Sequence, residues 1–209
     1  MLAPEAGSGH SDRVHVLADY GITDTDPEQG YEDVVRIATT LCRAPIALIS
    51  FVDDERQWFK AKLGTSLTET PREHAFCAHA IARPKEIMEV RDALQDERFA
   101  TNPLVTGEPH IRFYAGAPLV TADGHALGTI CVMDRAPRSL DRQTLDAVGA
   151  LARQVITLLE QRKTRTALEQ ALTAQRAAGA VSRRAAALFT EAFENAPIGI
   201  ALVSASGLW

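Results

Sequence analysis

Hydrophobic residues along the chain change their spacing several times, and each change marks a new element of secondary structure. In residues 30–45 the apolar side chains recur on one helical stripe, and Pro45 ends the helix. The run PIALISFV (45–52) is apolar on both faces, as expected of a central strand. After the turn DDER, the alternation in QWFKAKLG (57–64) predicts a second strand with one half-exposed face, so the two strands form a hairpin.

The middle of the chain, from Thr65 to Ile111, is less regular. PREHAFCAHAIA predicts a short helix that begins near Pro71, since proline fits the first turn of a helix. EIMEV (86–90) predicts a strand, and the polar stretch that follows contains a turn of helix at most. A long irregular segment in a compact domain is often a functional loop or lid, and we expect that role here.

Regular structure resumes with two apolar runs, FYAGAPLV (113–120) and ALGTICVMD (126–134). The Asp-Gly pair at 123–124 lies between them and is a strong hairpin signal. These runs therefore predict two further antiparallel strands.

A helix follows, with Ser139 or Asp141 as its N-cap, and its pattern continues to about Phe193 with Gly179 as the weakest point. Five apolar residues in it alternate spacings of three and four, the seam of a coiled coil: Leu145, Val148, Ala152, Val155 and Leu159. We expect this seam to join two copies of the chain in a homodimer, while a wider stripe packs on the sheet.

The two ends of the chain differ from the rest. Residues 1–12 are rich in glycine and serine and are expected to be disordered. In residues 193–209, Pro197 and Gly199 break the helix, and IALVSASG predicts a strand and turn. That strand has no later partner, so we expect it to start a further domain of a longer protein.

Composition excludes several classes of protein. The sequence contains no signal peptide and no apolar run of eighteen residues, so a cytoplasmic location without a membrane span is expected. Three scattered cysteines indicate free thiols rather than a disulfide framework. Residues 161–188 hold six basic residues and one acidic residue, but no aromatic residues stand between them, so a solvated helix face is favoured over nucleic-acid binding.

Four stretches taken in order resemble a GAF domain over about residues 13–160: APIALISFVDDERQWFKAKLG, FCAHAI, DERFATNPLVTGEPHIRFYAGAPL and GTICVMDRAPRSL. They are similar to GAF modules of bacterial histidine kinases and diguanylate cyclases. Residues 161–192 then resemble a signalling helix. FENAPIGIALVSASG resembles the opening of a PAS domain, so 193–209 would be its truncated start.

The resemblance implies an α+β fold with a central antiparallel sheet of five to six strands. Helices from both chain ends would cover one face, and the irregular middle segment would cover the other. A small ligand would bind between the sheet and that segment. The residues expected to line this pocket are Trp58, Lys60, Phe76, Cys77, His79, Arg98, Phe99, His110, Arg112 and Tyr114.

Cys77 and His79 are two reactive side chains placed two residues apart, and four roles are conceivable for them. A metal site would have at most three ligands, with His74 added, and only two of these share a helix face. As a nucleophile, Cys77 would need a lowered pKa, but His79 is poorly aimed to act as its base. A bilin anchor of the phytochrome type would have histidine directly after cysteine. The remaining role, a buried thiol that shapes the pocket wall, is favoured.

Arg112 has two possible roles. It would clamp a carboxylate or phosphate of the ligand, or it would tie the middle segment to Asp92 or Glu97 by an ion pair. Trp58 and Lys60 alternate with the apolar positions of their strand, so they line the pocket or face solvent.

Two known GAF chemistries are not supported by the residues present. Asp134-Arg135 stands where cyclic-nucleotide GAF domains of phosphodiesterases carry Asn-Lys. Free methionine sulfoxide reductases need clustered cysteines, whereas Cys42 and Cys131 fall in a helix and a strand that are expected to be core.

The sequence therefore predicts a non-catalytic sensory module, with no metal and no bilin or haem signature. It would bind an unknown small molecule, or respond to redox state, and signal through a dimeric helix to an output domain. Two alternatives stay open: a redox enzyme of the methionine sulfoxide reductase type that uses Cys77, and a GAF domain that only dimerises.

Overall fold

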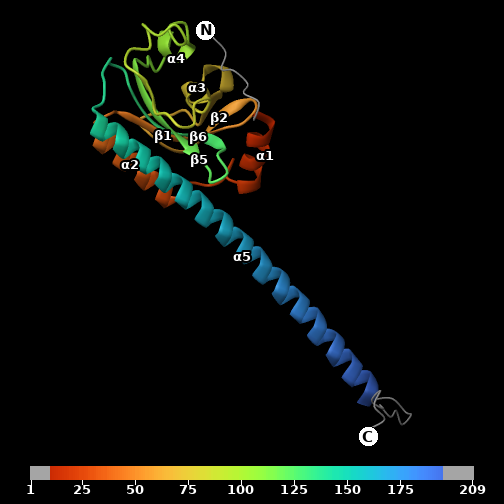
Figure 1. Ribbon diagram of the computed structural model, residues 1–209. Helices are drawn as coiled ribbons and strands as arrows, with labels where there is room; N and C mark the ends of the chain where they lie inside the picture. The colour runs from red at the N-terminus through yellow and green to blue at the C-terminus, as the bar shows by residue number, and fades with distance from the viewer. Residues whose placement is uncertain (1–9, 195–209) are drawn as a thin grey trace. The chain divides into compact units, whose positions relative to one another are not determined.

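The computed structural model describes residues 10–194 of the chain. Its contacts divide it into two units that meet between Lys163 and Thr164. Within residues 10–163, six strands form one antiparallel sheet in the order β3-β2-β1-β6-β5-β4 (Figure 1). The strands are β1 (Ile46–Val52), β2 (Arg56–Leu63), β3 (Glu69–Pro71), β4 (Met88–Val90), β5 (Phe113–Val120) and β6 (Ala126–Asp134). The predicted α+β fold is confirmed.

Helices from both ends of the first unit cover one face of the sheet (Figure 1). They are α1 (His10–Tyr20), α2 (Gln29–Cys42) and the first part of α5 (Arg142–Glu194). The stripe predicted for α2 is buried at Val34, Val35, Ala38 and Cys42. This helix ends at Cys42 because Arg43 takes a left-handed conformation, with φ of 48°.

The middle of the chain covers the opposite face, and we call residues 65–111 the cover. It contains a 3-10 turn, η1 (Arg72–His74), and two short helices, α3 (Phe76–Ala80) and α4 (Pro103–Thr106). The single helix predicted from Pro71 is split because Ala75 is extended, with φ of −79° and ψ of 116°. A second apolar cluster lies between the cover and the sheet, separate from the cluster under the helices.

The helix α5 begins after Asp141, whose carboxylate accepts a hydrogen bond of 2.6 Å from the backbone N–H of Thr144. The predicted N-cap at Asp141 is therefore confirmed. The helix continues through Gly179 to Glu194.

The residues predicted as a dimer seam pack instead against their own sheet. Four of them are at most 6% exposed within the helix-side core, namely Val148, Ala152, Val155 and Leu159, and Leu145 is partly buried beside them. This corrects the expected role of the seam, because apolar residues spaced three and four apart fit a sheet as well as a partner helix. In the second unit, by contrast, apolar side chains on α5 are 42–70% exposed: Leu168, Leu172, Val181, Leu188 and Phe189.

The structure describes only parts of the two terminal segments that the sequence predicted. Residues 10–12 of the segment expected to be disordered belong to α1, and residues 1–9 lie outside the described residues. Of the expected PAS start at 193–209, residues 193–194 are the last of α5 and the rest lies outside the described residues. Among residues 10–194, no helix has the length and hydropathy together that a bilayer crossing requires.

Candidate ligand pocket

A small cavity lies between the sheet and the cover, where the GAF resemblance placed a ligand. Its volume is about 30 Å³, which is room for one or two water-sized molecules. Three of the predicted pocket residues line it: Phe76, Cys77 and Tyr114. The other lining residues are Ile46, Leu48, Gln57, Phe59, Thr65, Leu67, Thr70, Leu104, Pro109, Ile111 and Met133.

The cavity runs from the surface to a buried base. Leu67 on its rim is 40% exposed, whereas Cys77 and Tyr114 are 1% and 0% exposed. Most of the wall is apolar, which suits a small neutral molecule. A larger ligand requires the cover to move.

The base of the cavity holds a cluster of polar side chains around the sulfur of Cys77. Thr129 Oγ1 donates to Cys77 Sγ at 2.9 Å and Gln57 Nε2 at 3.2 Å, while Ser50 Oγ and Tyr114 OH both lie at 3.4 Å. These four side chains come from β1, β2, β5 and β6, so each of the four central strands contributes one polar contact to the thiol of Cys77 on α3.

Burial and hydrogen bonding act in opposite directions on the cysteines. Burial raises the pKa of the Cys77 thiol, but hydrogen bonds from Cys131, Ser50, Thr129 and Tyr114 outweigh it, so that the pKa of Cys77 is lowered. The hydrogen bond to Cys77 and burial together raise the pKa of Cys131 well above its usual value. These surroundings favour the thiolate at Cys77 and the thiol at Cys131.

Aromatic stacking holds the wall of the cavity in place. The ring of Phe76 stacks on Phe99 with centroids 4.0 Å apart and on Tyr114 at 5.2 Å. Phe99 is fully buried behind Phe76, and the ring of His79 lies at 78° to the ring of Phe99, with centroids 4.9 Å apart. Arg98 lies over the ring of Phe99, 5.0 Å from its centroid. Phe99, His79 and Arg98 therefore support the wall from behind, and none of the three lines the cavity.

Arg112 and His110 also lie outside the lining of the cavity. The guanidinium of Arg112 donates to the carbonyl oxygens of Val105 at 2.8 Å and Ile111 at 3.1 Å. It ties the end of the cover to α4 through backbone atoms, which differs from both predicted roles, the anion clamp and the ion pair. The side chain of His110 is 48% exposed.

Trp58 and Lys60 face the other side of the sheet. The register of β1 and β2 shifts between Ile49 and Ser50, which leaves Lys60 without a partner residue across the pair. Trp58 packs in the helix-side core, and Lys60 Nζ bonds Glu28 Oε1 at 2.8 Å on that side. The prediction that they line the pocket is wrong, and Gln57 and Phe59 line it instead.

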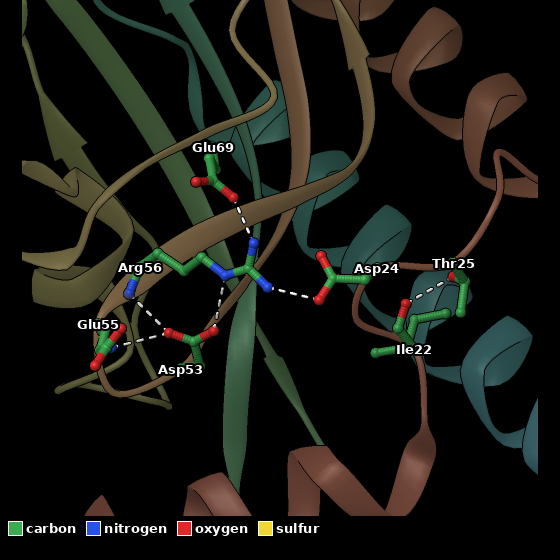
Figure 2. A network of polar contacts seen from close by, with 7 residues as sticks. All are labelled: Ile22, Asp24, Thr25, Asp53, Glu55, Arg56 and Glu69. Carbon is green, nitrogen blue, oxygen red and sulfur yellow. Dashed lines mark hydrogen bonds and ion pairs between the residues drawn. The ribbon is translucent and has the colours of Figure 1, made fainter.

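The edge of the pocket wall is fixed by an arginine in β2. Figure 2 shows the guanidinium of Arg56 between Asp24, 2.6 Å away, Asp53, 3.3 Å away, and Glu69 of β3. Asp53 also closes the turn between β1 and β2 by accepting the backbone N–H of Glu55 at 2.9 Å. Because Thr70 follows Glu69 and lines the cavity, this network positions the polar part of the wall.

Six polar residues in or beside the cavity were not predicted to be there: Ser50, Gln57, Thr65, Thr70, Thr129 and Cys131. Ser50 and Thr129 are polar residues in apolar strands, and that pattern was a usable signal. The hydroxyl of Thr70 is buried and has no hydrogen-bond partner among the described residues, so it is available to a ligand in the cavity. In the described part of the chain, no three His, Cys, Asp or Glu side chains are grouped as metal ligands.

Comparison with known proteins establishes the family. The sequence profile of the GAF domain matches residues 26–159. The chain therefore belongs to the GAF family, whose members are sensory and regulatory modules of signalling proteins.

One relative is a cyclic di-GMP phosphodiesterase of Pseudomonas aeruginosa, 44% identical over 160 residues. The match includes 77% of this chain and 25% of the relative, so the chain spans about a quarter of the relative's length. The expected relatives were a histidine kinase and a diguanylate cyclase, and this relative is neither.

Solved structures agree on the fold. A GAF domain from an Acinetobacter phosphoenolpyruvate-protein phosphotransferase is 16% identical, with a TM-score of 0.55 over 74% of this chain and 95% of that one. The second GAF domain of DevS from Mycobacterium smegmatis is 16% identical, with a TM-score of 0.51 over 68% of this chain and 99% of that one. At this identity the likeness concerns the fold alone.

Proposed function

We propose that this GAF domain binds a small molecule between the sheet and the cover and regulates an output that acts on cyclic di-GMP. The observation that carries the proposal is the cavity itself, whose lining includes Cys77, Tyr114 and Thr70, a residue whose buried hydroxyl has no hydrogen-bond partner in the described part of the chain. The phosphodiesterase activity of the 44% identical relative supports this output over a kinase or a cyclase.

The sheet provides a direct route from the cavity to α5. On β6, Cys131 and Met133 belong to the cluster under the cover, while Ile130 and Val132 pack in the core under the helices. Successive residues of a strand point to opposite faces, so a shift of β6 at the cavity also displaces side chains that face α5. A ligand drives this change only if it binds two arrangements of the domain with different affinity.

We also propose that α5 joins two chains in a homodimer. The contact would use the exposed apolar residues of the second unit, such as Leu168 and Leu172. The residues between Val148 and Leu159 are occupied by their own sheet and are not proposed as the contact.

A thermal-shift screen tests the binding proposal. A panel of nucleotides, amino acids, tetrapyrroles and small neutral metabolites is added to the chain, and a ligand at 100 times its Kd should add about 2.7 kcal/mol of stability. A flat response across the panel would contradict ligand sensing and favour a domain that only dimerises.

A matched pair of variants locates the site. Leu67→Trp narrows the rim of the cavity, and Leu94→Trp places the same bulk elsewhere on the cover, at a residue 43% exposed compared with 40% for Leu67. The proposal expects the shift to be lost in Leu67→Trp and kept in Leu94→Trp. An equal shift in both variants would place the ligand elsewhere.

A further inference from the structure

We propose that Cys77 and Cys131 are a peroxide-reactive thiol pair. A small hydroperoxide enters the cavity and oxidises Cys77, and the oxidised Cys77 then forms a disulfide with Cys131. The reaction needs no other ligand and goes beyond the function proposed above. Either can hold without the other.

The geometry of the two sulfurs carries this inference. Cys77 Sγ and Cys131 Sγ are 3.8 Å apart, although the residues lie 54 positions apart in the chain. A disulfide bond measures about 2.05 Å, so the sulfurs must approach by roughly 1.8 Å. Cys77 is on the short helix α3 at the base of the cavity, and a movement of that helix toward β6 would bring the two sulfurs together.

The cluster around Cys77 suits a nucleophilic sulfur. Its four polar neighbours, Ser50, Gln57, Tyr114 and Thr129, all present donor groups to it within 3.4 Å. Donors aimed at one sulfur stabilise its thiolate, which is the reactive form. Cys131 is fully buried and does not line the cavity, so it is placed to react with Cys77 and not with a molecule from solvent.

The size of the cavity selects the oxidant. A volume of about 30 Å³ accepts hydrogen peroxide, which has two heavy atoms, and excludes oxidised glutathione and other bulky disulfides. The apolar wall presents no charged group to the oxidant among the lining residues.

The steps balance in atoms and electrons. The thiolate of Cys77 attacks one peroxide oxygen, the O–O bond breaks, and hydroxide leaves and takes up a proton as water, which leaves Cys77 as a sulfenic acid. The sulfur of Cys131 then loses its proton and displaces the hydroxyl from Cys77, so that an S–S bond forms and a second water leaves. Two thiols have lost two electrons, and peroxide has become two waters. A dithiol reductant reverses the disulfide.

Formation of the bond would alter the wall of the cavity. Phe76 precedes Cys77 and stacks on both Phe99 and Tyr114. A movement of α3 toward β6 therefore also shifts the ring of Phe76, which forms the wall between the cavity and the rest of the cover. A redox signal and a bound molecule would act on the same part of the domain.

The third cysteine is an internal control. Cys42 is equally buried, but it lies in the helix-side core, away from the cavity, and burial raises the pKa of its thiol to about 11. It should stay reduced under conditions that oxidise Cys77.

The test is peptide mapping of the full, reduced chain after treatment with hydrogen peroxide and alkylation of the remaining thiols. The expected result is a Cys77–Cys131 disulfide with Cys42 alkylated, reversed by dithiothreitol. In Cys131→Ser, dimedone should capture a sulfenic acid on Cys77, and Cys42→Ser should behave like the wild type. Thr129→Val, which removes the shortest hydrogen bond, should slow oxidation of Cys77 by at least about threefold.

Two results would overturn the proposal. The first is that Cys77 and Cys131 stay reduced while circular dichroism shows a folded chain. The second is that all three cysteines react at the same rate, which indicates reaction through unfolding. If Cys131→Ser fails to fold, the disulfide map of the wild-type chain decides alone.

Discussion

Replacing Lys60 by methionine is predicted to destabilise the folded chain by about 2–4 kcal/mol without affecting the cavity. The side chain of Lys60 is fully buried, and its ammonium donates to Thr25 Oγ1 at 2.8 Å, to the carbonyl oxygen of Asp26 at 2.6 Å and to Glu28 Oε1 at 2.8 Å. It also lies 5.3 Å from the ring centroid of Tyr31.

The magnitude follows from what the substitution leaves behind. Removing one partner of a buried ion pair costs about 3–5 kcal/mol, largely because the other charge is stranded. Glu28 would not be stranded, since it is 30% exposed and keeps Arg162 Nε at 2.9 Å. Methionine also fills most of the volume of the lysine stem. The expected cost is therefore lower than the full value.

The control is Lys62→Met on the same strand. The ammonium of Lys62 donates to the carbonyl oxygens of Ser66 and Leu67, both at 2.8 Å, in an exposed setting. The expected cost is below about 1 kcal/mol. Urea unfolding followed by circular dichroism measures both variants, and the thermal-shift screen and the peroxide reaction are repeated on each. The reasoning is refuted if Lys60→Met keeps its stability and loses ligand binding, because Lys60 would then be a pocket residue.

Two further predictions concern backbone packing and pH. In Gly128→Ala the new Cβ would lie 1.9 Å from the carbonyl oxygen of Ser50, so β1 and β6 should fail to pair and the soluble fold should be lost. Gly149→Ala has no atom closer than 3.5 Å and lies inside α5, so thermal unfolding should show a gain of up to about 1 kcal/mol, and a loss would contradict the packing described. Burial raises the pKa of Glu28, but the hydrogen bonds and charges of Lys60 and Arg162 together outweigh it, and the net direction is down. The Glu28 carboxylate therefore stabilises the fold fully above its pKa in the unfolded chain, and this stabilisation is lost as the pH falls through its pKa in the folded chain. The urea midpoint should fall less on acidification in Glu28→Gln than in the wild type.

Most of the fold was predictable from the sequence because its long elements have a clear hydrophobic period. The central strands are buried along almost their full length, and their apolar runs indicate this directly. The strand β3 was missed because three residues, Glu69–Pro71, are too few to show an alternation. The helix α1 was missed because its segment follows a glycine-rich stretch.

The pocket was less predictable, because side chains from distant parts of the chain build it. Phe76, Cys77 and Tyr114 do line the cavity: the first two lie in the cover itself, and Tyr114 lies on the strand that follows it. Trp58 and Lys60 share one face of β2, as their alternation indicated, but it is the face under the helices, because alternation alone does not identify which layer covers a face. Cys131 was expected to be core, and it is, but its contact with Cys77 depends on the packing of α3 against β6, which no local pattern encodes.

The same limit explains the helix seam. A spacing of three and four records that one face of α5 is apolar, but it does not identify the surface that covers this face. In the structure the residues from Val148 to Leu159 are covered by the sheet of the same chain.

The most direct test of ligand sensing is hydrogen exchange on the chain with and without the compound that gives the largest thermal shift. The account predicts slower exchange across the cover, for example at the backbone N–H of Ile111, which bonds the carbonyl oxygen of Leu104 at 2.8 Å. Smaller changes should follow on β6 and in the first turns of α5. Protection confined to the groove between α5 and β5, lined by Pro118, Leu145 and Arg153, with the cover unchanged, would contradict it.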